Sequence, residues 1–177
     1  MARREQLKKK IGTGLLLFLG NDEVGMNYAD NTYSFRQDST FLYFFGLDFA
    51  GLAAIIDIDE NRTIIFGNEL TIDDIVWTGT QPTLKEKCEM VGVTESMPLN
   101  QLKSYLDKGK SKGQTVHFLP PYRGDHRIWL WELLGIELAA QGEKTSIPFI
   151  QAVVDMRNHK DEEELKCITK AQEITDK

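Results

Sequence analysis

The stretch GLAAIIDIDENRTIIFG, residues 51–67, contains two short apolar runs separated by a polar turn. The runs are GLAAIIDI (51–58) and RTIIFG (62–67), and the letters DENR (59–62) supply the turn between them. Apolar runs of this length, joined by a few polar residues, predict a β-hairpin. An antiparallel pair in the first half of the chain is therefore the starting point for predicting the fold.

The same residues begin like a calcium-binding loop, which is an alternative to the hairpin. Asp57, Asp59 and Asn61 occupy the first, third and fifth positions of such a loop. The sixth position is Arg62, where a calcium loop needs glycine, and the twelfth is Asn68, where it needs glutamate. The pattern therefore favours a tight hairpin turn over a calcium site.

Further strands and helices are predicted on both sides of the hairpin. LLLFL (15–19) is a continuous apolar run, typical of a strand covered on both faces. The other predicted strands are TFLYFFGL (40–47) and TVHFL (115–119), and FIQAVVDMR (149–157) is expected to be extended at first. Helices are predicted at 3–11, at 83–92 ending before Gly92, at 97–109, and at 125–142 between an Asp125 cap and Gly142. Interleaved strands and helices predict the α/β class, with a mixed β-sheet flanked by helices.

Composition limits the compartment and the kinds of partner. The chain has 177 residues and a net charge of −6, and this acidic balance argues against nucleic acid as a partner. No run of about 18 apolar residues occurs, so no membrane partner is expected. Cys88 and Cys167 form no CxxC pair or zinc-site pattern and are interpreted as reduced thiols, with a single disulfide between them left open as the alternative. We therefore expect a soluble, cytoplasmic protein.

The sequence contains no complete catalytic or metal-binding pattern. His117, His126 and His159 are far apart, and none has a second ligand at metal-site spacing. Neither a glycine-rich nucleotide loop nor a nucleophile elbow is present. The adjacent Asp73 and Asp74 are interpreted as marking a helix start or a turn. No catalytic residue, metal ligand or cofactor is therefore predicted within this chain.

The C-terminal stretch reads as an amphipathic helix capped by Asp161. Its apolar side consists of Leu165, Ile168 and Ile174. The helix either docks on the core as a tail or opens a second domain. A domain boundary is expected near residues 155–160, where polar residues interrupt the apolar pattern.

Three motifs together identify a known family. They are the segment ADNTYSFRQDSTFLYFFGLDFAGLAAIIDID (29–59), the pentapeptide IVWTG (75–79) and MRNHKDEEEL (156–165). In this order, they resemble the N-terminal domain of Xaa-Pro aminopeptidases (aminopeptidase P) in the creatinase/prolidase superfamily. The resemblance extends over nearly the whole chain, and it implies a ribonuclease H-like mixed sheet flanked by helices.

The resemblance also implies a catalytic half that this chain does not contain. Residues 1–157 would be the N-terminal domain, and residues 158–177 the start of a pita-bread catalytic domain. In this family the catalytic domain holds two metal ions, usually Mn²⁺, and hydrolyses the bond before a proline at the second position of a peptide. The fragment alone is expected to be inactive.

Family roles can be transferred to a few positions. Asp30 would join a hydrogen-bond network at the active site, or would cap a turn in a polar loop. Trp77 would bind substrate by reaching into a neighbouring subunit's active site, or would be a core tryptophan. Arg36 and Asp38 are expected to form an ion pair or to cap the following strand. Some members bind the peptide through an arginine after the long helix, where this chain offers only Lys144.

The implied partners are the chain's own C-terminal catalytic domain, a peptide with proline at its second position, and other copies in a homo-oligomer. The implied role is to shape the substrate cleft, to limit substrate length and to build subunit contacts. Two alternatives stay open. The chain could belong to a prolidase or creatinase relative, or to a metal-free peptide-binding homologue.

Overall fold

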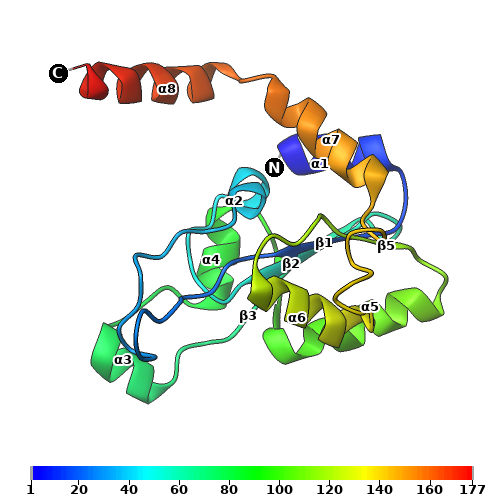
Figure 1. Ribbon diagram of the computed structural model, residues 1–177, viewed down its shortest axis with the longest axis horizontal. Coiled ribbons are helices and arrows are strands. Elements are labelled where there is room, and N and C mark those ends of the chain that lie inside the picture. Colours follow the sequence, from blue (N-terminus) through cyan, green and yellow to red (C-terminus); the bar gives the residue numbers. More distant parts are fainter. Residues whose placement is uncertain (1, 177) are drawn as a thin grey trace.

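A five-stranded mixed sheet forms the centre of the computed structural model, which describes residues 2–176. The strand order is β4-β3-β2-β1-β5. The strands are β1 (Leu15–Leu19), β2 (Ala53–Asp57), β3 (Arg62–Gly67), β4 (Glu95–Pro98) and β5 (Val116–His117). β2 pairs antiparallel with β1 and β3, whereas β5 pairs parallel with β1, and β4 with β3. Helices surround the sheet (Figure 1), so the predicted α/β class is confirmed.

The predicted hairpin is confirmed as the pair β2–β3. Ile55 lies opposite Ile64 in the register, and Asn61 turns the chain with a φ of 51°. Side chains alternate between the faces of a strand, so Leu16 and Leu17 of β1 belong to two different core clusters. Both faces of the hairpin strands are covered, which is why these runs are apolar without alternation.

Four helices cover one face of the sheet. They are α1 (Ala2–Ile11), α2 (Ser39–Phe45), α4 (Leu84–Met90) and α7 (Ile147–Asn158). Phe18 of β1 lies at the centre of this face, with its ring centroid 5.2 to 5.4 Å from those of Phe44, Phe45 and Phe149. Tilted and edge-on aromatic contacts of this kind add to the free energy gained from burying the rings.

Two helices cover the other face. They are α5 (Leu102–Ser111), which follows a short 3₁₀ turn η1 (Leu99–Gln101), and α6 (Gly124–Leu134). Leu106 of α5 and Leu130 of α6 pack there against Leu15, Leu17 and Phe66 of the strands. The sheet is therefore sandwiched between two helical layers, as the sequence predicted.

The strand predicted at residues 40–47 is wrong, because this segment forms helix α2. Asp38 caps the helix by accepting the backbone N–H groups of Thr40 and Phe41 at 2.9 and 2.8 Å. Gly46 ends it with a φ of 69°. Aromatic residues favour strands, but the cap and the glycine decide the local structure here.

The segment 149–157 is also helical rather than extended at its start. It belongs to α7, which begins after Ser146, and the Ser146 hydroxyl accepts the Phe149 N–H at 3.3 Å. Pro148 lies in the first turn, where a proline costs no hydrogen bond. These two start signals outweigh the β-branched residues that follow.

The remaining predictions differ from the structure mainly at their boundaries. α6 ends at Leu134 because Gly135 adopts a φ of 71°, so the predicted end at Gly142 is wrong. The residue before α6 is Arg123, so Asp125 lies within the helix and is not its cap. Strand β4 was not predicted, and the strand predicted at 115–119 contains only two paired residues. The helices predicted at 3–11 and 83–92 are confirmed as α1 and α4.

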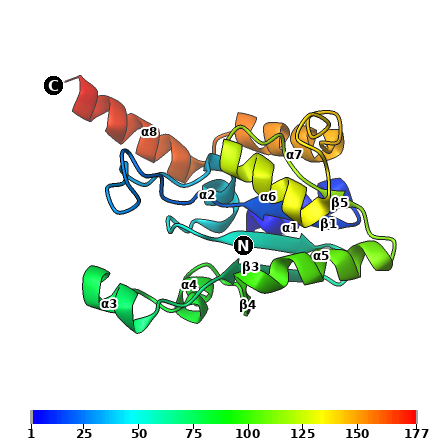
Figure 2. The ribbon, with the colours of Figure 1, turned by 60° about the horizontal axis from the view of Figure 1, so that its bottom comes forward.

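Two helices stand away from the sandwich, α3 (Ile72–Thr78) and α8 (Glu162–Thr175) (Figure 2). Asp161 caps α8 as predicted, and no residue of α8 is buried. The C-terminal helix is therefore not docked on the core, and its assignment to a second domain stays a prediction. Among residues 2–176, no helix is both long and apolar enough to span a membrane.

Candidate functional site

The strand directions bring three irregular segments to one edge of the sheet. β1, β3 and β5 point the same way, because β1 and β3 both pair antiparallel with β2 and β5 pairs parallel with β1. The chain leaves their carboxyl ends through residues 20–38, 68–83 and 118–123. We call the surface that these segments form the carboxyl edge; α3 and the loop of residues 20–38 lie on the same side of the molecule in Figures 1 and 2. Open sheets commonly bind ligands outside the carboxyl ends of their strands.

Buried side chains fix the base of the loop 20–38. The Asn21 backbone N–H donates to Gln37 Oε1 at 2.7 Å, and Gln37 Nε2 donates to the Phe49 carbonyl at 2.8 Å. His126 of α6 donates from Nε2 to the Gly20 carbonyl at 2.9 Å. A Cβ atom at Gly20 would lie 2.5 Å from the Leu52 carbonyl oxygen, so the loop can begin here only with glycine. The two ends of the loop are therefore held rigidly against the sheet.

The tip of the same loop is exposed and folds back on itself. The Tyr33 N–H donates to the Val24 carbonyl at 2.9 Å, and Gly25 forms an isolated antiparallel β-bridge with Thr32. Val24, Tyr33 and Tyr28 expose 43, 58 and 63% of their surface. A rigid base with an exposed aromatic tip suits a segment that contacts another molecule.

The structure decides between the roles predicted for Arg36 and Asp38. Asp38 is a cap, although of helix α2 and not of a strand. The Arg36 side chain is exposed and forms no ion pair within residues 2–176, so the predicted pairing with Asp38 is wrong. Asp30 lies at the exposed loop tip, where its side chain has no hydrogen bond to any residue that the structure describes. Its role in an active-site hydrogen-bond network stays a prediction.

Helix α3 presents its apolar residues to solvent. Its start is a capping box, in which Thr71 Oγ1 accepts the Asp74 N–H and the Asp74 carboxylate accepts the Thr71 N–H. Asp73 and Asp74 thus mark a helix start, as the sequence indicated. Trp77 is 88% exposed and Ile72 is 81% exposed, so Trp77 is not a core tryptophan of this chain. Its predicted contact with substrate stays a prediction.

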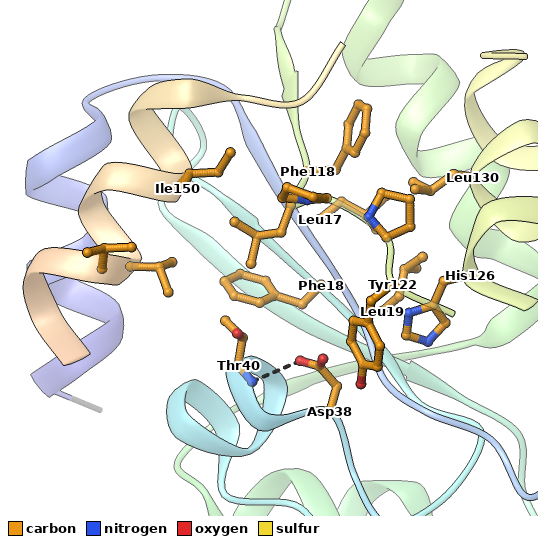
Figure 3. A pocket seen from close by; sticks show the side chains of 15 residues that line it. Leu17, Phe18, Leu19, Asp38, Thr40, Phe118, Tyr122, His126, Leu130 and Ile150 are labelled. Atoms are coloured by element: carbon orange, nitrogen blue, oxygen red, sulfur yellow. Dashed lines mark hydrogen bonds between the residues drawn. The ribbon is translucent and has the colours of Figure 1, made fainter. Parts of the chain in front are cut away.

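Two open pockets lie at the carboxyl edge. The larger, about 500 Å³, runs along the loop base and is lined in part by Tyr33, Arg36 and Arg123. The smaller, about 270 Å³, lies between α2, α6 and α7 (Figure 3). Its walls include Phe18, Phe118 and Ile150, while Asp38, Tyr122 and His126 gather at one end. Apolar walls with a few polar groups suit the binding of an apolar side chain from another molecule.

Tyr122 belongs to both pockets and stays protonated at neutral pH. The residue is 68% exposed, and its partial burial raises the pKa of the phenol, which the hydrogen bond with Asn21 offsets in part. The phenol oxygen lies 3.4 Å from Asn21 Nδ2. Tyr122 can therefore donate a hydrogen bond to a ligand. Arg123 beside it is held by Asp125 through two hydrogen bonds of 3.0 Å from Nε.

The carboxyl edge lacks the parts of a metal centre. Among residues 2–176, no three His, Cys, Asp or Glu side chains are placed to hold a metal ion together. His126 donates from Nε2 to the Gly20 carbonyl, so this nitrogen is already engaged. The resemblance places the two metal ions in the catalytic half, outside this chain, so we assign the chain no metal-dependent step.

Comparison with known proteins places the chain in a family. A family model described as the aminopeptidase P N-terminal domain matches residues 1–118, which is more than half of the chain. The chain belongs to this family. The resemblance inferred from the three sequence motifs is thereby confirmed, and so is the corresponding fold.

The relatives of this aminopeptidase P domain are longer proteins. A probable Xaa-Pro aminopeptidase of Chaetomium globosum is 30% identical over 115 residues, covering 61% of this chain and 18% of the relative. A probable Xaa-Pro aminopeptidase of Uncinocarpus reesii is 22% identical over 174 residues, covering 93% of this chain and 33% of the relative. Zinc-substituted aminopeptidase P of Escherichia coli, in complex with product, superposes with a TM-score of 0.78 at 22% identity, covering 98% of this chain and 41% of that chain; this likeness shows the fold. The chain spans no more than a third of the length of these two curated relatives.

Sequence reasoning missed several residues of the carboxyl edge. Tyr122, Arg123 and His126 were given no role, although they lie directly beside the loop 20–38. The available signal was the turn LPPYRGD (119–125), which follows a predicted strand. Had β5 been predicted as parallel to β1, this turn would have been placed at the same edge as the loop.

Proposed function

We propose that this chain is the non-catalytic N-terminal domain of an Xaa-Pro aminopeptidase, where its carboxyl edge forms a wall of the substrate cleft. The observation that carries the proposal is the exposure of α3, which leaves Ile72, Val76 and Trp77 uncovered at this edge. The full enzyme would remove the N-terminal residue that precedes a proline. The names of the curated relatives support this activity.

Physical reasons support a binding role for α3. Seven residues are too few for a helix that is stable by itself, and exposed apolar patches on soluble proteins commonly mark contacts with other molecules. The Trp77 indole is a flat apolar surface on which a proline ring packs well. In the proposed homo-oligomer, Trp77 reaches the substrate bound to a neighbouring subunit, and Asp30 joins a hydrogen-bond network there.

Metal chemistry belongs to the other half of the proposed enzyme. Two metal ions, Mn²⁺ in the proposal, would activate water and polarise the scissile carbonyl. Residues 158–177 would begin the domain that holds them, after an N-terminal domain of residues 1–157. The proposed compartment is the cytoplasm, which rests on the interpretation of the two cysteines as reduced thiols.

The test uses the complete reading frame that contains this chain, with two matched tryptophans. Trp77→Ala should lower kcat/KM for an Xaa-Pro peptide by about two- to tenfold, the worth of one aromatic contact. Trp131→Ala is the control, because Trp131 is also exposed but lies on α6. If both substitutions lowered kcat/KM equally, or if neither lowered it, the basis for a cleft role of α3 would be removed.

The chain of residues 1–177 is assayed in parallel with added Mn²⁺. Turnover of an Xaa-Pro peptide by this chain would contradict the non-catalytic role. The two alternatives are distinguished by the complete protein. Preference for a dipeptide or for creatine would indicate a prolidase or creatinase relative, and peptide binding without hydrolysis would indicate a metal-free homologue.

A further inference from the structure

The direction of α8 is set by a joint of three residues. α7 ends at Asn158, α8 begins at Glu162, and residues 159–161 connect them. α8 buries no residue, so packing against the core does not hold it in place. It nevertheless leaves the body in one defined direction, away from α7 and α1 (Figure 1).

Arg3, in the first turn of α1, contacts the beginning of α8. Its Nη2 atom donates to Asp161 Oδ2 at 2.6 Å and lies 3.3 Å from Glu164 Oε2. Its Nη1 atom donates to the Tyr43 carbonyl in α2 at 3.3 Å. Within residues 2–176, each hydrogen bond or ion pair between residues 161–176 and another helix ends on Arg3.

Tyr43 contacts Arg3 through its ring and α7 through its hydroxyl. The Arg3 Cζ atom lies 4.0 Å from the centroid of the Tyr43 ring, within the range of a cation–π contact. The Tyr43 hydroxyl donates to the Met156 carbonyl at 3.0 Å, in the last part of α7. One tyrosine thus links α2 and α7 on one side of the joint and holds the guanidinium that contacts α8 on the other.

The charges at the joint reinforce this arrangement. Burial by itself would lower the pKa of Arg3, but the hydrogen bond to Asp161 and the charge of Glu164 outweigh it, and the pKa is raised. The backbone N–H of Glu164, and then Arg3, hold the pKa of Asp161 below its ordinary value. Both partners are therefore ionised at neutral pH.

We propose that Arg3, Tyr43 and Asp161 form a clamp that fixes the angle at which α8 leaves the domain. Arg3 and Tyr43 are positioning residues, since they act through α8. An exposed ion pair adds little to global stability, but orienting a helix that buries no residue requires only a small local bias. The consequence for catalysis rests on the proposed function, because the clamp would then position the catalytic half.

Spin labels on the chain of residues 1–177 test the clamp directly. One label goes on the native Cys167, which is exposed on α8, and the other on Lys85→Cys, an exposed position of α4. The remaining thiol, Cys88, is buried, and burial raises its pKa to about 11, so it does not compete for the label. Pulsed electron paramagnetic resonance should give one narrow distribution of distances between the two labels.

Arg3→Met should broaden this distribution at least twofold, and Tyr43→Leu should broaden it too. Lys9→Met is the matched control, because it removes an exposed cation from α1 that has no side-chain bond to α8. Far-UV circular dichroism of each variant confirms that the fold is retained. An unchanged width in Arg3→Met, or a distribution that is already broad in the parent chain, would overturn the proposal.

The distance measurement does not depend on peptidase activity, so it separates the clamp from the proposed function. In the complete protein, Arg3→Met should lower kcat/KM severalfold while Lys9→Met leaves it unchanged. Broadening without this loss would keep the clamp and overturn its role in catalysis. A complete protein without peptidase activity would overturn the proposed function but leave the distance result intact.

Discussion

Helices α2 and α3 are alike in length and in local design, yet only one of them is part of the core. Each has seven residues, begins at a side-chain cap and ends at a glycine with positive φ. α2 buries Phe41, Phe44 and Phe45, whereas α3 buries nothing. Apolar content and capping therefore make a segment helical, but they do not decide what its apolar side chains contact.

The difference comes from the segments on either side of each helix. α2 follows the loop base that Gln37 fixes to the sheet, and this attachment places its aromatic rings against β1. α3 lies between β3 and α4, and residues 69–81 are exposed throughout. A helix held away from the core in this way keeps its apolar residues available for another molecule, which is what the proposed function requires.

The largest expected contrast is in global stability. Phe45→Ala should lower the free energy of unfolding by about 3–5 kcal/mol, because Phe45 is 2% exposed and packs against Phe18 and Phe41. Trp77→Ala should change the same quantity by no more than about 0.5 kcal/mol. Urea unfolding followed by far-UV circular dichroism measures both. A similar loss in the two variants would mean that α3 is part of the core after all.

The sequence predicted those elements whose determinants are local or continuous. The hairpin, β1, α4 and α8 were placed correctly, since each is a run of one pattern ended by its own turn or cap. α2 was missed because its aromatic run also fits a strand, and only Asp38 and Gly46 distinguish the two structures. β4 was missed because it is paired along one side only and half exposed.

The candidate site was less predictable, because it depends on strand order. Asp30 and Trp77 were named through the family resemblance, without knowledge of where they lie. Tyr122 and His126 come close to the loop base only because β5 pairs parallel with β1, across about 100 residues of chain. No periodicity in the sequence specifies that pairing.

A smaller contrast is expected from removing the caps of the two helices. Asp38→Ala should cost about 1 kcal/mol of unfolding free energy, because two N–H groups of α2 lose their acceptor in a helix that belongs to the core. Asp38→Asn is the control and should retain most of that stability, since asparagine is an equally good cap. Thr71→Ala should leave global unfolding unchanged and reduce only the helicity of α3. If Asp38→Ala and Thr71→Ala lowered the free energy of global unfolding by similar amounts, the two helices would unfold together.

The smallest expected effect is a pH response confined to α3. The Thr71 N–H and hydroxyl hold the pKa of Asp74 below its ordinary value, and in α4 Thr83 does the same for Glu86. A carboxylate whose pKa is lower in the folded state favours the helix above the unfolded pKa, and this support is lost as the pH falls through the folded pKa. Below about pH 4, α3 should therefore lose its helical NMR shifts.

α4 is the internal control for this titration, because it has the same capping box but buries Leu84 and Cys88. Protonation of Glu86 should leave α4 helical, since packing holds it in place. Thr71→Val, which removes only the hydroxyl, should raise the pKa of Asp74 part of the way to its ordinary value, because the backbone N–H still donates. If α3 kept its helical NMR shifts in acid to the same extent as α4, a contact beyond the capping box would have to stabilise α3. The contrast between a core helix and an unpartnered helix would then fail.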